Sequence, residues 1–124
     1  SLQELCSASL LENGARIKFS SDEPNYDLPA RLTITIFRIC QELISNCQKH
    51  SGASEASLEF RTFDEEKLII IEFVDNGIGF ETADTSSGLG LNNILNRLNL
   101  IRGKFKVENL NSQCKVTITI PNDQ

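Results

Sequence analysis

Apolar residues recur at helical spacing in three segments of the chain, and a glycine follows each segment. These segments span residues 2–10, 29–52 and 88–103. The first carries its apolar positions at Leu2, Leu5, Cys6 and Leu10. The longest apolar face belongs to the second segment and consists of Leu32, Ile36, Ile39, Cys40, Leu43, Ile44 and Cys47. The spacing predicts three amphipathic helices, each able to cover part of one core.

Alternating or continuous apolar runs predict five strands, at residues 15–20, 55–62, 67–74, 104–109 and 114–120. The run KLIIIEFV is apolar on both faces, which predicts a strand in the centre of the sheet. Strands adjacent in sequence occur as two pairs, so the sheet should be mixed and not doubly wound. We therefore expect an α/β fold, a two-layer sandwich of about five strands covered on one face by three helices. Residues 1–124 form one domain in this prediction, without repeats or a linker.

Composition narrows the classes of function. A chain of 124 residues with 40% hydrophobic residues can bury one core. Its net charge of −5 argues against a general nucleic-acid-binding surface. No apolar stretch approaches the length of a membrane span, and no signal peptide is visible. Because the sequence starts directly in a helical pattern, we expect a domain that belongs to a longer protein.

The cysteine pattern favours buried thiols over a metal site. None of the four cysteines forms a CxxC pair, and the single histidine is not spaced to complete a zinc site. Cys40 and Cys47 lie two turns apart on the apolar face of the second predicted helix. The sequence thus predicts small buried side chains in a reducing compartment.

The stretch FVDNGIGF has two interpretations. The run before it ends on Asp75, and Asn76-Gly77 after an apolar run is the strongest short signal for a β-hairpin. A second glycine, Gly79, and a carboxylate fixed at the end of a strand are more than a hairpin needs. The stretch therefore predicts either a tight turn or a binding loop that begins with a carboxylate.

Polar residues share one arc of the second predicted helix. Glu42, Asn46 and Lys49 occupy positions i, i+4 and i+7, beside the apolar face. Most such stripes are solvated helix faces. Asparagine is a mediocre helix former, however, and its amide oxygen can ligate Mg²⁺ without adding charge among phosphate oxygens. Lys49 could then neutralise phosphate, and Glu42 could position water or accept a proton.

A second glycine cluster, SGLGL, opens the third predicted helix. A GxG sequence at this place lets backbone N–H groups approach a phosphate at the helix N-terminus. The cluster is not a dinucleotide-binding fingerprint, because no third glycine follows at the required spacing, and the chain has no GxxxxGK loop.

Together these stretches resemble one family. QELISNCQKHSGAS resembles the N box of the GHKL ATPase superfamily, VDNGIGF its G1 box and SGLGLNNILNRL its G2 box. The resemblance runs over essentially the whole chain, through to VTITIP, and implies the Bergerat ATP-binding fold. Within the superfamily the chain resembles the catalytic, ATP-binding domain of a sensor histidine kinase. The short ETADTSS lid and Arg97 point to the histidine kinases that partner NarL-type response regulators.

This resemblance implies roles for individual residues. Asn46 holds the Mg²⁺ that bridges the phosphates, and Glu42 is the catalytic acid/base or water-orienting carboxylate. Asp75 accepts a hydrogen bond from the adenine amino group. The other implied contacts to ATP are Lys49 and His50 at phosphate or ribose, Gly77 and Gly79 at the base, and Gly88, Leu89 and Gly90 at the lid over the phosphates. The family usually carries Gly-Thr before its last strand, near adenine, where this chain has Gln113 and Cys114.

The expected protein is thus a cytoplasmic kinase module that uses ATP and Mg²⁺. Its partners are the phosphoacceptor and dimerisation domain of the parent kinase and, indirectly, a response regulator. No plausible acceptor histidine lies in the chain, since His50 belongs to the N box. The alternatives are an anti-sigma-factor-like serine kinase, a nucleotide-binding module without catalysis, and an α/β domain without nucleotide.

Overall fold

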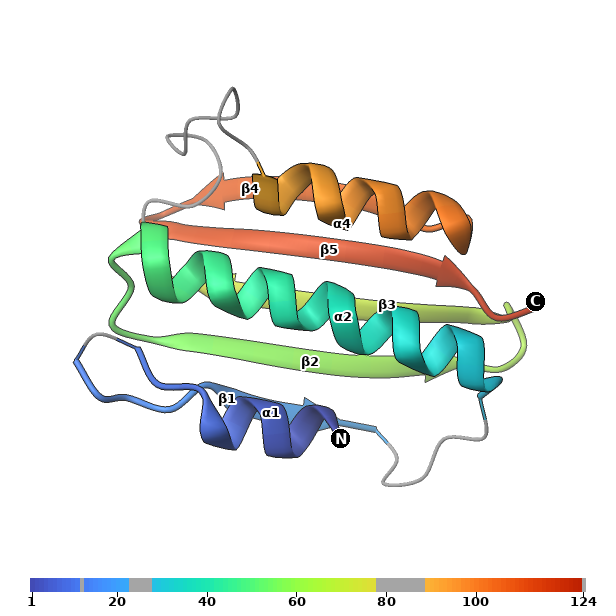
Figure 1. Ribbon diagram of the computed structural model, residues 1–124, viewed down its shortest axis with the longest axis horizontal. Coiled ribbons are helices and arrows are strands. Elements are labelled where there is room, and N and C mark those ends of the chain that lie inside the picture. Colours follow the sequence, from blue (N-terminus) through green and yellow to red (C-terminus); the bar gives the residue numbers. More distant parts are fainter. Residues whose placement is uncertain (12, 23–27, 78–88, 124) are drawn as a thin grey trace.

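The computed structural model describes residues 1–11, 13–22, 28–77 and 89–123. Within these residues five strands form one sheet, and three α-helices lie on one of its faces (Figure 1). The helices are α1 (Leu2–Ala8), α2 (Ala30–Asn46) and α4 (Leu89–Leu100), and a π-helical turn, η1 (Cys47–Ser51), continues α2. The strands are β1 (Lys18–Ser21), β2 (Ala56–Phe63), β3 (Leu68–Asp75), β4 (Lys104–Leu110) and β5 (Gln113–Pro121). The predicted two-layer α/β sandwich is confirmed.

The sheet is mixed, as its sequence order predicts. The strand order is β1-β2-β3-β5-β4, with β1 parallel to β2 and the other neighbours antiparallel. The strand that is apolar on both faces, β3, does lie in the centre. Only one of its faces is covered by the described helices, and Ile70 on the other face is half-buried. Across that outer face Glu72 forms ion pairs with Arg61 at 2.9 Å and with Lys115 at 3.3 Å.

Helix α2 supplies the centre of the core. All seven residues of its predicted apolar face are buried, none more than 4% exposed. They pack against the inner face of the sheet, where Phe73 and Ile71 of β3 are also buried. Arg31 in the first turn of α2 donates a hydrogen bond of 2.8 Å to the carbonyl of Leu100, at the end of α4. The two long helices are therefore fixed to each other as well as to the sheet (Figure 1).

Helix α1 is shorter than its apolar spacing predicts. It begins with a capping box between Ser1 and Glu4 and ends at Ala8. The hydroxyl of Ser9 donates to the carbonyl of Leu5 at 2.7 Å, while the Ser9 backbone leaves the helical region with ψ near 119°. Leu10 then forms a β-bridge with Arg16 and is 48% exposed. The prediction that Leu10 continues the apolar face of this helix is wrong.

Two turns near the C-terminus depend on positive φ angles. At the end of α4 the residue with φ of 57° is Arg102, not the glycine that follows it. Gly103 is needed for space, because a Cβ there would lie 2.5 Å from Cδ2 of the buried Leu98. Asn111 and Ser112, with φ of 48° and 67°, join β4 to β5. Positive φ at both central residues is typical of the two-residue hairpin that matches strand twist.

Candidate functional site

The residues singled out in the sequence gather at one end of the molecule. Figure 1 shows the C-terminal end of α2, the end of β3, the start of α4 and the start of β5 at the same end of the sandwich, on the left of the view. These elements carry Asn46, Lys49, Asp75 and Cys114. Glu42 lies one turn before Asn46 on α2. Residues as far apart in sequence as Asn46 and Cys114 thus lie at the same end of the sandwich.

Asp75 is a buried carboxylate at the last position of the central strand. It is 7% exposed, and one of its oxygens, Oδ1, accepts a hydrogen bond of 2.8 Å from the backbone N–H of Gly77. Burial raises the pKa of the Asp75 carboxyl above its ordinary value, and the bond from Gly77 partly opposes this shift. Within the described residues Oδ2 has no hydrogen-bond partner. Asp75 can therefore accept one further hydrogen bond from a group placed against this end of the sheet.

If Asn76-Gly77 formed a hairpin turn, the next strand would have to pair with β3. Both neighbours of β3 are already filled, by β2 and β5, along its whole length. The hairpin interpretation of FVDNGIGF is therefore wrong, and the chain leaves the sheet after Asp75.

Cys114 lies directly beside Asp75. The two residues are paired in the antiparallel register of β3 and β5, so their side chains point to the same face of the sheet. Cys114 is 1% exposed and belongs to the hydrophobic core. The register places this thiol at the predicted adenine end of the site, and its burial also fits a simple packing role.

The polar stripe on α2 is present, but its last member is displaced from an ideal α-helix. Glu42 and Asn46 are half-buried, and Lys49 is exposed. Lys49 lies in the π-helical turn η1, where bonds from i to i+5 widen the helix, so its direction differs from that expected for 3.6 residues per turn. None of the three side chains makes a hydrogen bond or an ion pair with another described residue. Single-turn π segments of this kind are frequent at functional sites.

The other predicted contacts lie at the ends of the described segments or beyond them. Gly79, Gly88 and the predicted lid lie outside the described residues. His50 is described only as part of η1, and Leu89 and Gly90 only as the first turn of α4. Gly77 is half-buried next to Asp75.

The donor set suits a magnesium ion that is held largely by phosphates. Within the described residues no group of three histidine, cysteine, aspartate or glutamate side chains could hold a metal ion by itself. The Asn46 amide oxygen is a hard, neutral ligand, half-buried and without a partner among the described residues. Mg²⁺ usually keeps several waters and takes one or two protein ligands plus substrate phosphates. Asn46 fits such a site.

Sequence reasoning missed the role of Asn76. Its side chain makes three hydrogen bonds with Ser54 and Glu55, in the connection between η1 and β2. The Asn-Gly pair indicated only a turn, because nothing local in the sequence shows a partner 22 positions away.

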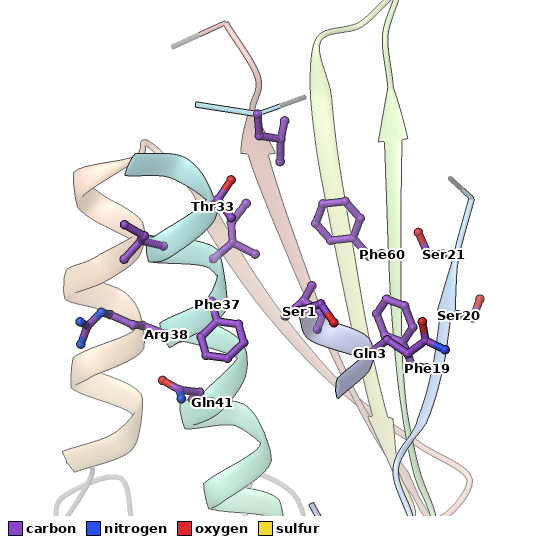
Figure 2. A pocket seen from close by; sticks show the side chains of 14 residues that line it. Ser1, Gln3, Phe19, Ser20, Ser21, Thr33, Phe37, Arg38, Gln41 and Phe60 are labelled. Atoms are coloured by element: carbon purple, nitrogen blue, oxygen red, sulfur yellow. The ribbon is translucent and has the colours of Figure 1, made fainter. Parts of the chain in front are cut away.

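A groove between α1 and α2 was also missed, and it is separate from the predicted site. It has a volume of about 1120 Å³ and is lined by residues of α1, β1, β2 and of α2 as far as Gln41. Figure 2 shows Phe37 and Gln41 of α2 facing Phe19 of β1 and Phe60 of β2 across it. None of the residues predicted for the nucleotide site lines it. The spacing of apolar residues did not reveal the groove, because Phe37 lies outside the apolar face assigned to α2.

Comparison with known proteins shows to which family this chain belongs. Residues 32–124, about three quarters of the chain, match the family described as histidine kinase-, DNA gyrase B-, and HSP90-like ATPase. The chain belongs to this ATPase family. The N box, G1 box and G2 box of this ATPase domain all lie within the matched residues.

The relatives of this ATPase domain include a histidine-protein kinase/phosphatase and a sensor protein. It is 30% identical over 88 residues to the signal transduction histidine-protein kinase/phosphatase UhpB of Salmonella typhimurium, covering 71% of this chain and 17% of UhpB. It is also 30% identical over 101 residues to the sensor protein VraS of Staphylococcus saprophyticus, covering 81% of this chain and 28% of VraS. The chain therefore spans less than a third of the length of these relatives.

The fold is that of solved histidine kinases. The Acinetobacter baumannii histidine kinase AdeS superposes with a TM-score of 0.71 at 20% identity, covering 99% of this chain and 59% of that structure. Taken with the family and the curated relatives, this identifies the chain as the catalytic, ATP-binding domain of a two-component sensor histidine kinase. No described helix of the ATPase domain is both long enough and apolar enough to cross a membrane.

Proposed function

We propose that this domain binds ATP with Mg²⁺ and transfers the γ-phosphoryl group to a histidine on a separate phosphoacceptor and dimerisation domain of its parent kinase. The observation that carries the proposal is the buried carboxylate of Asp75, which ends the central strand and keeps one oxygen without a partner among the described residues. Adenine offers an amino group as a donor where guanine has a carbonyl oxygen, so a fixed acceptor selects ATP over GTP.

The polar groups of α2 and η1 have the chemistry that the phosphate end requires. The Asn46 amide oxygen would hold Mg²⁺, which neutralises charge on the phosphates. Lys49 is exposed and carries a positive charge for a phosphate oxygen, and His50 follows it in η1. The first turn of α4, with Leu89 and Gly90, presents backbone N–H groups to phosphate. Gly79 and Gly88 are proposed to give the base and the phosphates room.

Glu42 is proposed as the general base. Phosphoryl transfer needs little covalent chemistry from the protein, so positioning and charge stabilisation dominate. As the imidazole nitrogen of the acceptor attacks the γ-phosphorus, the bond to the β–γ bridging oxygen breaks and ADP leaves. The attacking imidazole must lose its ring proton, and Glu42, half-buried on α2, would accept it or orient a water that does.

We also propose the setting of the parent protein. Because ATP is available inside the cell, the parent would hold this domain in the cytoplasm, and phosphate would pass from the histidine to a NarL-type response regulator. Arg97 on α4 and the brief ETADTSS segment support this group over an anti-sigma-factor-like serine kinase.

Calorimetric titration tests the adenine assignment. The wild-type domain should bind ADP and show no measurable binding of GDP. Asp75→Ala should weaken ADP binding by about 1.5–3 kcal/mol, the value of a hydrogen bond to a charged group. Asp64→Ala, in the exposed turn between β2 and β3, is the matched control and should bind ADP as the wild type does. Equal ADP affinity for Asp75→Ala and the wild type would sink the proposal.

A further inference from the structure

Asn76 directly follows Asp75 and is exposed, yet its side chain is held in place by three hydrogen bonds. Its Oδ1 accepts from the backbone N–H of Ser54 at 2.8 Å and from that of Glu55 at 3.0 Å. Its Nδ2 donates to the hydroxyl of Ser54 at 2.8 Å. The backbone N–H of Asn76 donates to the carbonyl of Glu55 at 3.2 Å. The carboxamide oxygen therefore uses both of its acceptor positions on one short segment.

These bonds fasten the chain just where the sheet stops. The regular pairing of β2 with β3 ends at Ala56 and Asp75. Beyond that pair, the Asn76 side chain satisfies two backbone N–H groups that the ladder no longer reaches. Asn13 donates to the carbonyl of Ser54 at 3.2 Å, so the same segment is also tied to the loop after α1. We call the bonds from Asn76 to Ser54 and Glu55 the anchor. It is thus supported by two parts of the chain.

The anchor acts on Asp75 through the backbone. Asn76 is the one residue between Asp75 and Gly77, whose N–H donates to Asp75 Oδ1 at 2.8 Å. The conformation of Asn76 therefore determines whether that N–H reaches the carboxylate, and which carboxylate oxygen is left for a ligand. Asp75 is buried and Asn76 is exposed, so the two side chains point in different directions. The carboxamide oxygen of Asn76 already accepts hydrogen bonds from Ser54 and Glu55.

We propose that Asn76 is a positioning residue for nucleotide selection: its carboxamide locks the end of β3 onto the start of β2 and so holds the Asp75 carboxylate in the direction that accepts adenine. This inference rests on the proposed function, because it assumes that Asp75 reads the base. A residue that serves only stability would weaken the fold without acting through Asp75.

A double-mutant cycle separates these two roles. Asn76→Ala should weaken ADP binding about tenfold or more, the effect of losing one well-placed hydrogen bond. In an Asp75→Ala background the same substitution should change ADP affinity by less than about twofold, because the group it positions is gone. Asn76→Asp is nearly isosteric and keeps both acceptor positions, so it should restore most of the affinity. Ser54→Ala removes one bond and leaves both backbone N–H bonds, and is the matched control expected to bind ADP within about twofold of the wild type.

Hydrogen exchange of the Gly77 amide provides a reading that needs no nucleotide. This amide donates to Asp75 and not to Asn76, so it reports the geometry that Asn76 is proposed to maintain. It should exchange at least about tenfold faster in Asn76→Ala than in the wild type, and at the wild-type rate in Asn76→Asp. If Asn76→Ala does not fold, Asn76→Ser, whose hydroxyl is too short to reach both N–H groups, should show the same changes to a smaller degree.

Each result bears on one claim. An equal loss of ADP affinity in both backgrounds, or an unchanged Gly77 amide, would overturn the positioning role. Failure of the wild type to bind ADP, or full binding by Asp75→Ala, would instead overturn the proposed function. In that case faster exchange at Gly77 would still show that Asn76 fixes this turn. Unchanged exchange would refute the positioning role as well as the proposed function.

Discussion

Burial raises the pKa of the Asp75 carboxyl, so the folded chain keeps this proton to a higher pH than the unfolded chain does. The native state therefore binds more protons than the unfolded state from about the ordinary pKa of 3.8 up to the raised value. Across that window the contribution of Asp75 to the free energy of unfolding falls as the pH rises. Above that window the Asp75 carboxylate is charged, a state that its burial disfavours.

Asp75→Asn should therefore stabilise the domain at neutral pH while weakening its binding of ADP. The amide is uncharged and keeps an oxygen for the Gly77 N–H. Its thermal midpoint without ligand should exceed that of the wild type at pH 7. The difference should shrink as the pH falls through the raised pKa of Asp75 toward 3.8, and it should be smallest well below 3.8, where Asp75 is protonated in both states. Thermal midpoints over a pH series test this, with the exposed Asp64→Asn as control. A lower midpoint at pH 7 would contradict the expectation.

Cys114→Thr examines the neighbouring position. A thiol is a weak donor and acceptor, whereas a hydroxyl serves well as both. Since Cys114 is paired with Asp75 and points to the same face, a hydroxyl there should strengthen ADP binding by about 0.5–1.5 kcal/mol. Calorimetry and the thermal midpoint must be measured together. A stable variant with unchanged or weaker binding would leave Cys114 as a packing residue only.

At the scale of elements, the helix α2 and its π turn carry the predicted metal ligand. Asn46 is the last α-helical residue, immediately before η1. Asn46→Ala should remove most of the Mg²⁺ dependence of ATP binding while the fold stays intact, because alanine favours the helix and the Asn46 side chain has no described partner. ATP titrations with and without Mg²⁺ measure this, and Asn96→Ala on the exposed face of α4 is the control. A wild-type response to Mg²⁺ would make the stripe an ordinary solvated face.

Most elements were predictable because their signals are local. The apolar face of α2 was read correctly at all seven positions, and β3 was placed in the centre from its composition. The end of α1 was not, since Ser9 ends the helix by a hydrogen bond that apolar spacing does not register. Nor was η1, because a pattern of 3.6 residues per turn cannot reveal bonds from i to i+5.

The site was predictable in part, and for a similar reason. The motifs singled out Asp75 and Asn46 as candidate residues, and the register of β3 with β5 pairs Cys114 with Asp75. The bonds from Asn76 to Ser54 and Glu55 could not be foreseen, because they depend on two segments meeting only after the sheet has formed. The groove of Figure 2 likewise depends on α1, α2 and the strands β1 and β2 meeting in the folded chain.

On the scale of the whole molecule, we propose that the domain supplies the residues for ATP and that its single histidine, His50, is not the phosphoacceptor. It spans 17% of UhpB and 28% of VraS, so the acceptor is proposed to lie elsewhere in the parent protein. Incubation of this chain with γ-labelled ATP should leave it unlabelled. Addition of the helical acceptor domain of the parent should place acid-labile label on that domain, and Glu42→Gln should reduce its rate. Acid-labile phosphate on this chain alone would refute the expectation.

The order of strands also affects how strongly the domain tends to associate with other copies of itself. An open sheet has two outer strands whose unpaired backbone groups invite another chain to add to them. Here one border is β1, only four residues long, and the other is β4, where Lys104, Lys106 and Glu108 alternate on the outer side. A short edge strand and a charged one both discourage edge-to-edge pairing of sheets between molecules. Both borders of the sheet in this kinase domain therefore disfavour amyloid-like association between molecules.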